Sequence, residues 1–416
     1  MKVPRCKGSR DLSPQEMSQF RYIESTFQEH CQKWGYEEVR TPTLEYLHLF
    51  TSTGTLTPSR LGKVYSFLDW DGWSGERIVL RPDGTIPVAR LYVDSMEDQE
   101  LARLFYVTNV FSYEQTGTKA REIWQCGAEL IGSDSWLADV ELMLLALETL
   151  QGLGLDNTEL KLSHAGVIKA YLTCLGIDDK ERGKLFDQIL DGNSVVLDSI
   201  KIDKSALRDL LPSLFTLNGK SSGFLKNIRS SLDNNLTEFG PYFDNFITIT
   251  DLLERLSLKY VIDITSGRGF EYYTGIMFRF SINGDEVGGG GRYNNLIPLL
   301  SNRNIPASGF ALYLDQLIPH IDQLTTPKSS VKKILLRNIS EELPPTRLIS
   351  TAKRLRKAGY ITSLSFNSEV RPTFYWLLDM QQGKPLYKLT NLATGSQSEL
   401  SAIDEVLAKL REENAP

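Results

Sequence analysis

The chain has 416 residues, of which 41% are hydrophobic and 24% are charged, and its formal net charge is −6. This composition is typical of a folded globular protein, and it excludes a mainly disordered chain and a polytopic membrane protein. The length favours two domains over one. The negative charge argues against a protein that binds nucleic acid by bulk electrostatics.

Cysteine and histidine are sparse and show no metal-binding spacing. The four cysteines are far apart along the chain: Cys6, Cys31, Cys126 and Cys174. We interpret them as reduced thiols of a cytoplasmic protein. No apolar segment follows the basic N-terminal residues, so a secretory signal is not expected. The sequence thus predicts no metal, no cofactor and no membrane-spanning segment.

The first third of the chain alternates between helices and hairpins. A helix is predicted from about 14 to 34, because Ser13 and Glu16 form a capping box, Pro14 occupies the first helical position and Gly35 ends it. The elements expected after it are a strand at 39–45 broken by Pro42, a hairpin of 65–68 with 78–80, a helix at 85–95, a hairpin of 104–114 with 122–131, and a helix at about 137–150.

The remainder has a helical block between strand-like segments. The expected elements are a strand at 156–164, amphipathic helices over about 166–257, strands at 260–265 and 272–282, a helix near Tyr293, and then a strand at 333–336, a helix at 345–359, a strand at 362–366 and a C-terminal helix. Because strands and helices do not alternate regularly, a doubly wound parallel sheet is not expected. The predicted fold is α+β, with an antiparallel sheet flanked by helices, a helical insertion and a small C-terminal α/β domain. The boundaries are a core over 1–322, a linker over 323–331 and the second domain over 332–416.

Polar residues gather on the predicted strands between 80 and 130. Gln125 and Glu129 are four residues apart on one strand, and a period of two places both on the same face. Asp83 and Thr85 lie at a strand-to-helix turn. Such groups predict a site for a polar ligand, and the alternative is a solvated sheet face.

Two further segments are candidates for a site. The segment 266–275 combines Arg268 with Tyr272 and Tyr273, which supply a fixed charge, hydrogen-bond donors and stacking surface, although a tyrosine-rich hairpin would look the same. The run Gly288–Gly291 precedes a predicted helix and is compatible with a phosphate cradle. It lacks the spaced glycine–lysine pattern of nucleotide loops, so alone it is a weak signal.

The order of these motifs resembles that of histidyl-tRNA synthetases. The segments that carry the resemblance are 8–14, Pro42 with Glu45, 81–85, 111–114, 121–125, 127–129, 268–273, 290–293 and 309–312. The resemblance implies a class II aminoacyl-tRNA synthetase fold and a histidine-binding site. In that site Asp83, Thr85 and Gln125 would bind the α-amino end, Glu129 and Tyr273 would bind the imidazole, and Arg268 would lie beside the carboxylate. Gly84 and Tyr272 would complete it.

Two positions depart from the synthetase pattern. Ser112 and Gln316 stand where the family has arginines that hold ATP during adenylate formation. Fixed cations stabilise the charge that develops on the transferred phosphate, and losing one such donor costs roughly 3–4 kcal/mol. The sequence therefore predicts no catalytic residues and no independent enzyme activity.

A histidine site without ATP chemistry resembles the synthetase paralogues that serve as regulatory subunits of ATP phosphoribosyltransferase. The resemblance implies a partner, the short catalytic subunit, and feedback by histidine at the first step of histidine biosynthesis. It implies a homodimer, formed around Pro42 and Glu45, within a hetero-oligomer. The alternative function is a divergent histidyl-tRNA synthetase that ligates histidine to tRNA with ATP.

The C-terminal domain is compatible with a third function. The segments 352–360 and 386–392 resemble parts of the anticodon-binding domain of synthetases. The domain is only mildly basic, which favours a retained packing module. The alternative is retained tRNA binding, as in a synthetase-like RNA-binding protein.

Overall fold

The structure is a computed structural model of the whole chain. It describes residues 3–53, 56, 61–70, 75–174, 185, 188, 219–231, 239–264, 273–322, 333–340, 342–366 and 374–413. The chain folds as two compact units, residues 1–326 and 327–416. The segment expected to be the linker, 323–331, lies outside the described residues.

A large sheet forms the centre of the first unit. Eight described strands follow the order β1-β5-β6-β11-β10-β9-β7-β8. Their bounds are β1 Glu37–Glu38, β5 Ala102–Phe111, β6 Glu122–Ile131, β7 Glu159–His164, β8 Tyr260–Ile262, β9 Ile276–Ile282, β10 Asp285–Arg292 and β11 Ala307–Tyr313. The pairs β1–β5 and β7–β8 are parallel and the other five are antiparallel. The antiparallel core of this sheet is the one that the sequence predicts.

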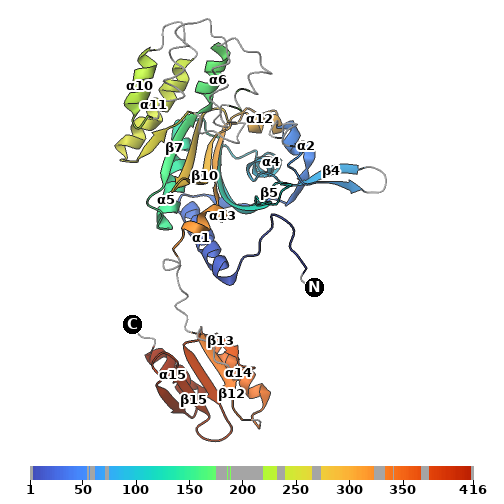
Figure 1. Cartoon of the computed structure of the whole chain (residues 1–416), viewed down its shortest axis with the longest axis vertical. Coiled ribbons are helices and arrows are strands. Elements are labelled where there is room, and N and C mark those ends of the chain that lie inside the picture. The colour runs from blue at the N-terminus through green and yellow to red at the C-terminus, as the bar shows by residue number, and fades with distance from the viewer. Residues whose placement is uncertain are drawn as a thin grey trace. The chain divides into compact units, whose positions relative to one another are not determined.

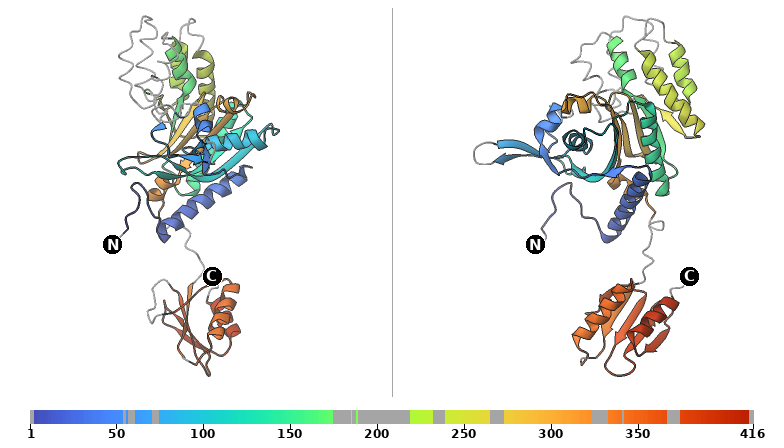
Figure 2. Two further views of the ribbon diagram at one scale, coloured as in Figure 1. Left: turned by 90° about the vertical axis from the view of Figure 1, so that its right-hand side faces the viewer. Right: turned by 180° about the vertical axis from the view of Figure 1, so that it is seen from behind.

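Helices cover both faces of this sheet. α1 (Pro14–Lys33) and α5 (Trp136–Gly152) pack on one face, and α4 (Thr85–Ser95) lies inside the curve of the other (Figure 1). The view from behind gives the same arrangement (Figure 2). Three short helices complete the layers: α12 Leu296–Leu300, α13 Leu314–Leu317 and the 3₁₀ helix η2 Ile318–His320. α4 therefore stands over the face that carries the polar residues.

The first helix shows how local sequence sets the fold. Ser13 Oγ accepts a hydrogen bond from the Glu16 amide, and the Glu16 carboxylate accepts one from the Ser13 amide. This reciprocal cap fixes the start of α1 where the sequence predicts it. The buried apolar side of α1 consists of Phe20, Ile23, Phe27 and Cys31. Phe27 packs edge-on against Phe105 of β5 and Phe310 of β11, which joins the helix to the sheet.

A small sheet extends from the first unit. Its order is β2-β4-β3, with β2 Leu44–Tyr46, β3 Ser66–Trp70 and β4 Gly75–Leu80, and α2 (Leu47–Ser52) follows β2. Glu45 points toward α4, where Arg90 Nη2 lies 2.9 Å from its Oε1. Leu44 and Tyr46 point to the opposite face and are half-exposed. One face of this small sheet is thus apolar and open.

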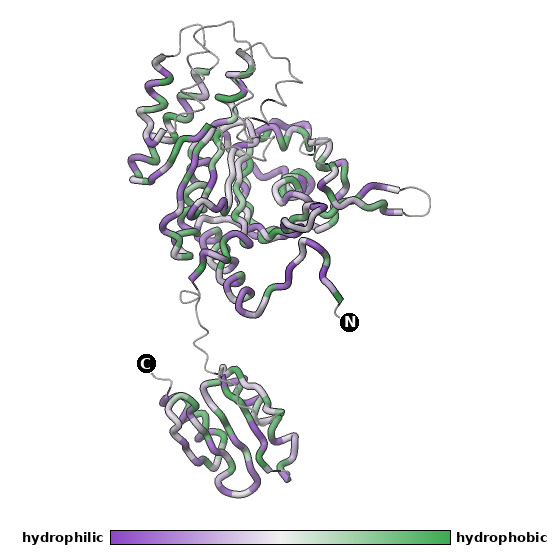
Figure 3. The backbone as a smooth tube through the Cα atoms, in the orientation of Figure 1, coloured by the Kyte–Doolittle hydropathy of each residue, from purple (hydrophilic) through white to green (hydrophobic). Residues whose placement is uncertain are grey.

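The helical insertion is described in part. Its described helices are α6 Ala165–Cys174, α10 Ser222–Ser231 and α11 Gly240–Arg255. In Figure 3 they alternate between hydrophobic and hydrophilic residues, as amphipathic helices do. Lys226 pairs with Asp251 at 2.7 Å and joins α10 to α11. None of the described helices of the chain is long and apolar enough to cross a membrane.

The second unit is a mixed sheet with helices. Its described strands follow the order β13-β12-β14-β15-β16, with β12 Lys333–Asn338, β13 Ile361–Leu364, β14 Trp376–Met380, β15 Tyr387–Asn391 and β16 Gln397–Leu400. α14 (Pro345–Lys357) and α15 (Ile403–Glu412) pack on it. Its own core includes Ile334, Leu355, Trp376 and Val406. The unit buries enough apolar surface to form a separate hydrophobic core.

One structural prediction is wrong. Gly288–Gly291 are not a loop before a helix, because they form the middle and end of strand β10. Their amides and carbonyls pair with β9 and β11 on either side. Backbone groups that are used in a sheet cannot cradle a phosphate. The α+β class and the predicted helices and hairpins before residue 165 are confirmed, with shifts of a few residues at their ends.

Candidate ligand site

Two rows of residues cross three central strands and form the floor of the candidate site. The first row is Glu129 of β6, Gly309 of β11 and Gly291 of β10, and the second is Gly127, Ala311 and Gly289 on the same strands. Paired residues in antiparallel strands point to the same face, so all six face α4. Five of the six are glycine or alanine. Glu129 is therefore the one large side chain among the six, and neighbouring side chains can pack closely over the others.

The missing side chains make room for specific neighbours. A Cβ atom at Gly309 would lie 1.7 Å from Oε2 of Glu129. A Cβ atom at Gly127 would lie 2.2 Å from Cζ of Tyr106. Tyr106 therefore lies over Gly127, and the Glu129 carboxylate lies over Gly309. Glycine is needed at both places because of close approach rather than because of backbone conformation.

Glu129 is fully buried and hydrogen-bonded by two tyrosines. Tyr106 Oη donates to Oε1 at 3.2 Å, and Tyr293 Oη donates to Oε2. Burial raises the pKa of Glu129 to about 8, while hydrogen bonds from Tyr293, Thr85 and Tyr106 oppose the shift. The carboxyl group of the unliganded protein is therefore mostly protonated at neutral pH. For Glu129, the alternative of a solvated sheet face is wrong.

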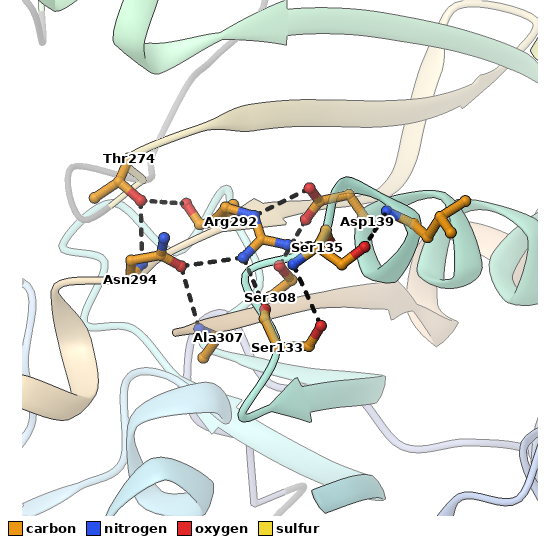
Figure 4. Close-up of polar contacts among 9 residues, drawn as sticks. Ser133, Ser135, Asp139, Thr274, Arg292, Asn294, Ala307 and Ser308 are labelled. Carbon is orange, nitrogen blue, oxygen red and sulfur yellow. Dashed lines mark hydrogen bonds and ion pairs between the residues drawn. The ribbon is translucent and has the colours of Figure 1, made fainter. Parts of the chain in front are cut away.

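Tyr293 is held in place by its neighbour Arg292. Nε of Arg292 lies 3.0 Å from Oδ2 of Asp139 in α5, and both side chains are buried. The guanidinium also donates to the carbonyl oxygens of Ser133 at 2.9 Å and Ser135 at 2.8 Å (Figure 4). This network fixes the end of β10 against the start of α5. It thereby fixes the residue that donates to Glu129.

The turn before α4 carries Asp83, Gly84 and Thr85 above the floor. Oδ1 of Asp83 accepts the Ile86 amide at 2.8 Å, so this carboxylate caps the first turn of α4. A Cβ atom at Gly84 would lie 2.7 Å from Cε2 of Tyr106. Asp83 thus has a structural role in the absence of ligand.

Arg81 anchors this turn from below. Its guanidinium is buried, and it donates to the carbonyls of Asn109 at 2.7 Å, Thr41 at 2.8 Å and Pro42 at 2.9 Å. Because a buried cation needs partners on all its N–H groups, these carbonyls fix the geometry of the turn. Arg81 therefore acts as a clamp between β4, the segment after β1, and β5.

Tyr273 lies at the far end of the first row. Its Cδ1 atom is 3.2 Å from the position that a Cβ atom of Gly291 would take, and the side chain is buried. Its carbonyl accepts a hydrogen bond from Lys169 Nζ of α6 at 2.8 Å. Burial raises the pKa of the Tyr273 hydroxyl, and Tyr313, Glu129 and Asp83 add to the shift through their negative charge. These groups therefore surround one space over the floor.

The structure brings six of the eight predicted site residues to this region: Asp83, Gly84, Thr85, Gln125, Glu129 and Tyr273. Gln125 is half-buried on the face of Glu129 and lies opposite Tyr313 of β11. Arg268 and Tyr272 lie outside the described residues. Within the described ranges, no group of three or more metal-binding side chains is found. The described site offers a carboxyl group, hydroxyls and an amide, which suit a small polar ligand with hydrogen-bond donors.

The sequence analysis does not identify three tyrosines that contribute to the site. Tyr106, Tyr293 and Tyr313 all contribute to the site, although the sequence motifs assign none of them a binding role. Tyr106 lies directly opposite Gly127, two residues from the Glu129 row. A large aromatic residue opposite a strand glycine is the signal that points to it, because the ring needs the space that the glycine leaves.

The two departures from the synthetase pattern lie toward the loop end of the β5–β6 hairpin. Ser112 follows β5, Gln316 lies in α13, and both are exposed. Nearby, a cleft of about 260 Å³ is lined by Gly8, Ser9, Arg10, Leu12, Gly117, Thr118, Lys119, Ala120, Glu122, Trp124 and Asp315. In this cleft Asp315 is already bound by the Trp124 amide at 2.7 Å and by Arg10. Neither Ser112 nor Gln316 supplies a cation here.

Sequence and structure comparisons place this chain in a known family. The sequence model of the histidyl-tRNA synthetase family matches residues 8–317, so the chain belongs to that family and has its class II synthetase fold. The histidine–tRNA ligase of Methanocaldococcus jannaschii is 32% identical over 370 residues, which cover 86% of this chain and 85% of the relative.

Within that family the chain belongs to the ATP phosphoribosyltransferase regulatory subunits. A protein of that name from Dehalococcoides mccartyi is 47% identical over 411 residues, which cover 99% of both chains. A crystal structure described as an ATP phosphoribosyltransferase regulatory subunit/histidyl-tRNA synthetase from Bacillus halodurans matches with a TM-score of 0.75. That match has 24% identity and covers 89% of this chain and 95% of the other, and it supports the fold alone. The name of the full-length relative agrees with the expectation that the chain is a regulatory subunit and not itself an enzyme.

Proposed function

We propose that this protein binds L-histidine over the Glu129 floor and reports its occupancy to the short catalytic subunit of ATP phosphoribosyltransferase. The observation that carries the proposal is the buried Glu129 carboxyl group, hydrogen-bonded by two tyrosines on a floor whose other five residues are glycine or alanine. The tyrosine hydroxyls donate hydrogen bonds but supply no positive charge, so a cationic ligand group would stabilise the buried carboxylate further. The imidazole of histidine is such a group.

The ligand orientation follows from the positions of the polar groups. The imidazole would lie on the first row between Glu129 and Tyr273. The α-amino group would lie toward Asp83, Thr85 and Gln125. The proton that Glu129 carries without ligand can pass to the imidazole, which gives an ion pair in the buried site.

Histidine binding at this site can regulate a reaction only if the reaction takes place at a second site. A protein that binds histidine without activating it has an effect only if binding changes an equilibrium elsewhere, and the active site of a catalytic partner supplies that place. Coupling of roughly 1–3 kcal/mol would give about 5–150-fold inhibition by histidine. The partnership belongs to the cytoplasm, where the thiols of Cys6, Cys31 and Cys126 stay reduced.

The test mixes the full-length protein with the short catalytic subunit. Mass and turnover are followed with and without histidine. We expect a hetero-oligomer whose turnover falls when histidine is added. If no complex forms and the histidine sensitivity of the transferase is unaltered, the proposal fails. Binding of tRNA with no effect on the transferase would instead favour an RNA-binding role for the second unit.

A further inference from the structure

The second row of the floor ends at an arginine that no sequence motif singles out. Arg279 of β9 pairs with Gly289 of β10, which pairs with Ala311 of β11. A Cβ atom at Gly289 would lie 3.3 Å from Cγ of Arg279. The stem of this arginine therefore lies over the glycine, on the face that carries Glu129. The charged end of the side chain acts electrostatically on Tyr273 and Tyr313, which border the candidate site.

The charge on Arg279 acts on the other groups of the site. It lowers the pKa of the Tyr273 and Tyr313 hydroxyls, against the larger raising effect of burial. Asp83 acts on both of these hydroxyls with the opposite sign. Arg279 is thus a described cation that faces the proposed α-amino and imidazole subsites. Its side chain is only 11% exposed, so water screens its charge less and its electrostatic effect on neighbouring groups is stronger than that of a surface arginine.

One partner of Arg279 in the unliganded protein, Glu286, is exchangeable. Nη1 lies 2.7 Å from Oε2 of Glu286, whose side chain is 41% exposed. Water can solvate the Glu286 carboxylate when another carboxylate replaces it at the guanidinium. The planar fork of a guanidinium suits a carboxylate in particular.

The spacing of the two rows fits an amino acid. The row of Gly289 and Arg279 is two residues along the strands from the row of Gly291 and Glu129, which is about 7 Å. A histidine whose imidazole contacts Glu129 would place its main-chain groups over the second row. In that row Ala311 contributes only a methyl group between Tyr106, which lies over Gly127, and Arg279, which lies over Gly289.

We propose that Arg279 binds the α-carboxylate of the ligand, in a subsite over Gly289 and Ala311. The inference rests on the proposed histidine-binding function and deepens it. Arg279 thereby provides a cation near the floor, in a family member that has Ser112 in place of an arginine at the loop end of the β5–β6 hairpin. It makes the site selective for an amino acid over an amine or an alcohol of the same shape.

The experiment compares two ligands by titration calorimetry of the full-length protein. L-histidine has the carboxylate, and L-histidinol has a hydroxymethyl group in its place. Arg279→Gln is expected to weaken histidine binding by about 10- to 100-fold, as expected for the loss of a hydrogen-bonded charge, and to leave histidinol binding within about twofold. Arg77→Gln is the matched control, because Arg77 is an exposed arginine of β4 whose Nη1 donates to Ser66 Oγ of β3 at 3.1 Å.

A second variant keeps the test valid if Arg279→Gln folds poorly. Glu286→Gln removes the carboxylate that competes with the ligand, and we expect it to tighten histidine binding several-fold without affecting histidinol. Equal losses for both ligands in Arg279→Gln would overturn the inference, because they would indicate a structural role. Unchanged histidine affinity would overturn it as well. If the wild-type protein binds neither ligand, the histidine-sensing function itself fails and the inference falls with it.

Discussion

Arg292 and Asp139 form a buried ion pair that joins the end of β10 to the first turns of α5, with Nε and Oδ2 3.0 Å apart. Ser308 Oγ donates to the other carboxylate oxygen at 2.6 Å. The ion pair holds Arg292 in place and thereby positions the next residue, Tyr293, whose hydroxyl donates to Glu129. The Asp139 carboxylate therefore links the packing of α5 to the position of the tyrosine that contacts Glu129.

Removing that carboxylate should destabilise the protein strongly. Asp139→Ala leaves the Arg292 guanidinium buried without its charge partner, and we expect the free energy of unfolding of the first unit to fall by about 3–5 kcal/mol. Asp244→Ala is the matched control, because Asp244 pairs with Arg229 at 3.1 Å on the surface and should cost less than about 1 kcal/mol. Urea unfolding of both variants measures the difference. Equal costs would contradict the structural role of the pair.

Histidine affinity should have a bell-shaped dependence on pH. The complex needs one proton shared between Glu129, whose pKa is about 8 without ligand, and the imidazole, whose ordinary pKa is about 6.5. Below about pH 6.5 both groups are protonated, and above about pH 8 neither is, so affinity falls on both sides. Calorimetry from pH 5.5 to 9 tests this. Glu129→Gln should lose the alkaline limb, and a variant that keeps it would show that another group titrates.

The same carboxyl group should make the unliganded protein less stable as pH rises. Its pKa is higher in the folded chain than in the unfolded chain, so the folded state binds more protons between about pH 4.5 and pH 8. The free energy of unfolding contributed by Glu129 therefore falls with rising pH across that window and is constant above it. Relative to Glu129→Gln, wild type should lose stability from pH 5 to pH 8. A constant difference between the two proteins would refute the raised pKa.

Loss of single polar groups should weaken histidine binding by measurable amounts. Glu129→Ala removes the imidazole partner and the carboxylate that accepts hydrogen bonds from Tyr106 and Tyr293, at a cost of about 1–3 kcal/mol in binding. Asp83→Asn keeps an oxygen that caps the Ile86 amide and removes only the charge, so it separates ligand binding from helix capping. Calorimetry on folded variants measures both. Unchanged affinity in both would mean that the ligand binds elsewhere.

Adenylate formation should be absent. Ser112 and Gln316 supply no positive charge for a transferred phosphate, so the protein with ATP, histidine and magnesium should show no pyrophosphate exchange above background. An active histidyl-tRNA synthetase serves as the positive control. Exchange at a rate typical of synthetases would refute the regulatory function. Restoring both arginines need not restore exchange, because catalytic contributions are not additive.

The open face of the small sheet should mediate self-association. Leu44, Tyr46 and Phe67 are each between 46% and 49% exposed on one face of β2, β4 and β3. The combined change Leu44→Asp and Tyr46→Asp should convert a homodimer to a monomer, because it places charges in an apolar interface. Leu256→Asp changes an equally exposed leucine in another element and is the control. Light scattering gives the masses, and a dimeric double variant would place the interface elsewhere.

Much of the fold follows from local rules, and the site follows only partly. The cap of α1, the turn at Asp83 and the alternation in β6 are encoded by neighbours in the sequence, so their positions could be predicted. The role of Tyr106 depends on strand register, which a single sequence does not reveal. The prediction of a loop at Gly288–Gly291 is wrong because a glycine-rich strand and a glycine-rich loop have the same composition. Arg279 was missed because its role depends on an empty position on the neighbouring strand.

Substitutions at two glycines of the central sheet would affect protein abundance and ligand response differently. A Cβ atom at Gly290 would lie 2.2 Å from the carbonyl oxygen of Gly309, and one at Gly309 would meet the Glu129 carboxylate. A saturation library would therefore report Gly290 as a position that controls protein abundance, since its side chain would point into the packed layer beneath the sheet. Gly309 would fail through both abundance and ligand response. Screening for altered effector choice is better directed at Ala311, where the floor already tolerates a methyl group.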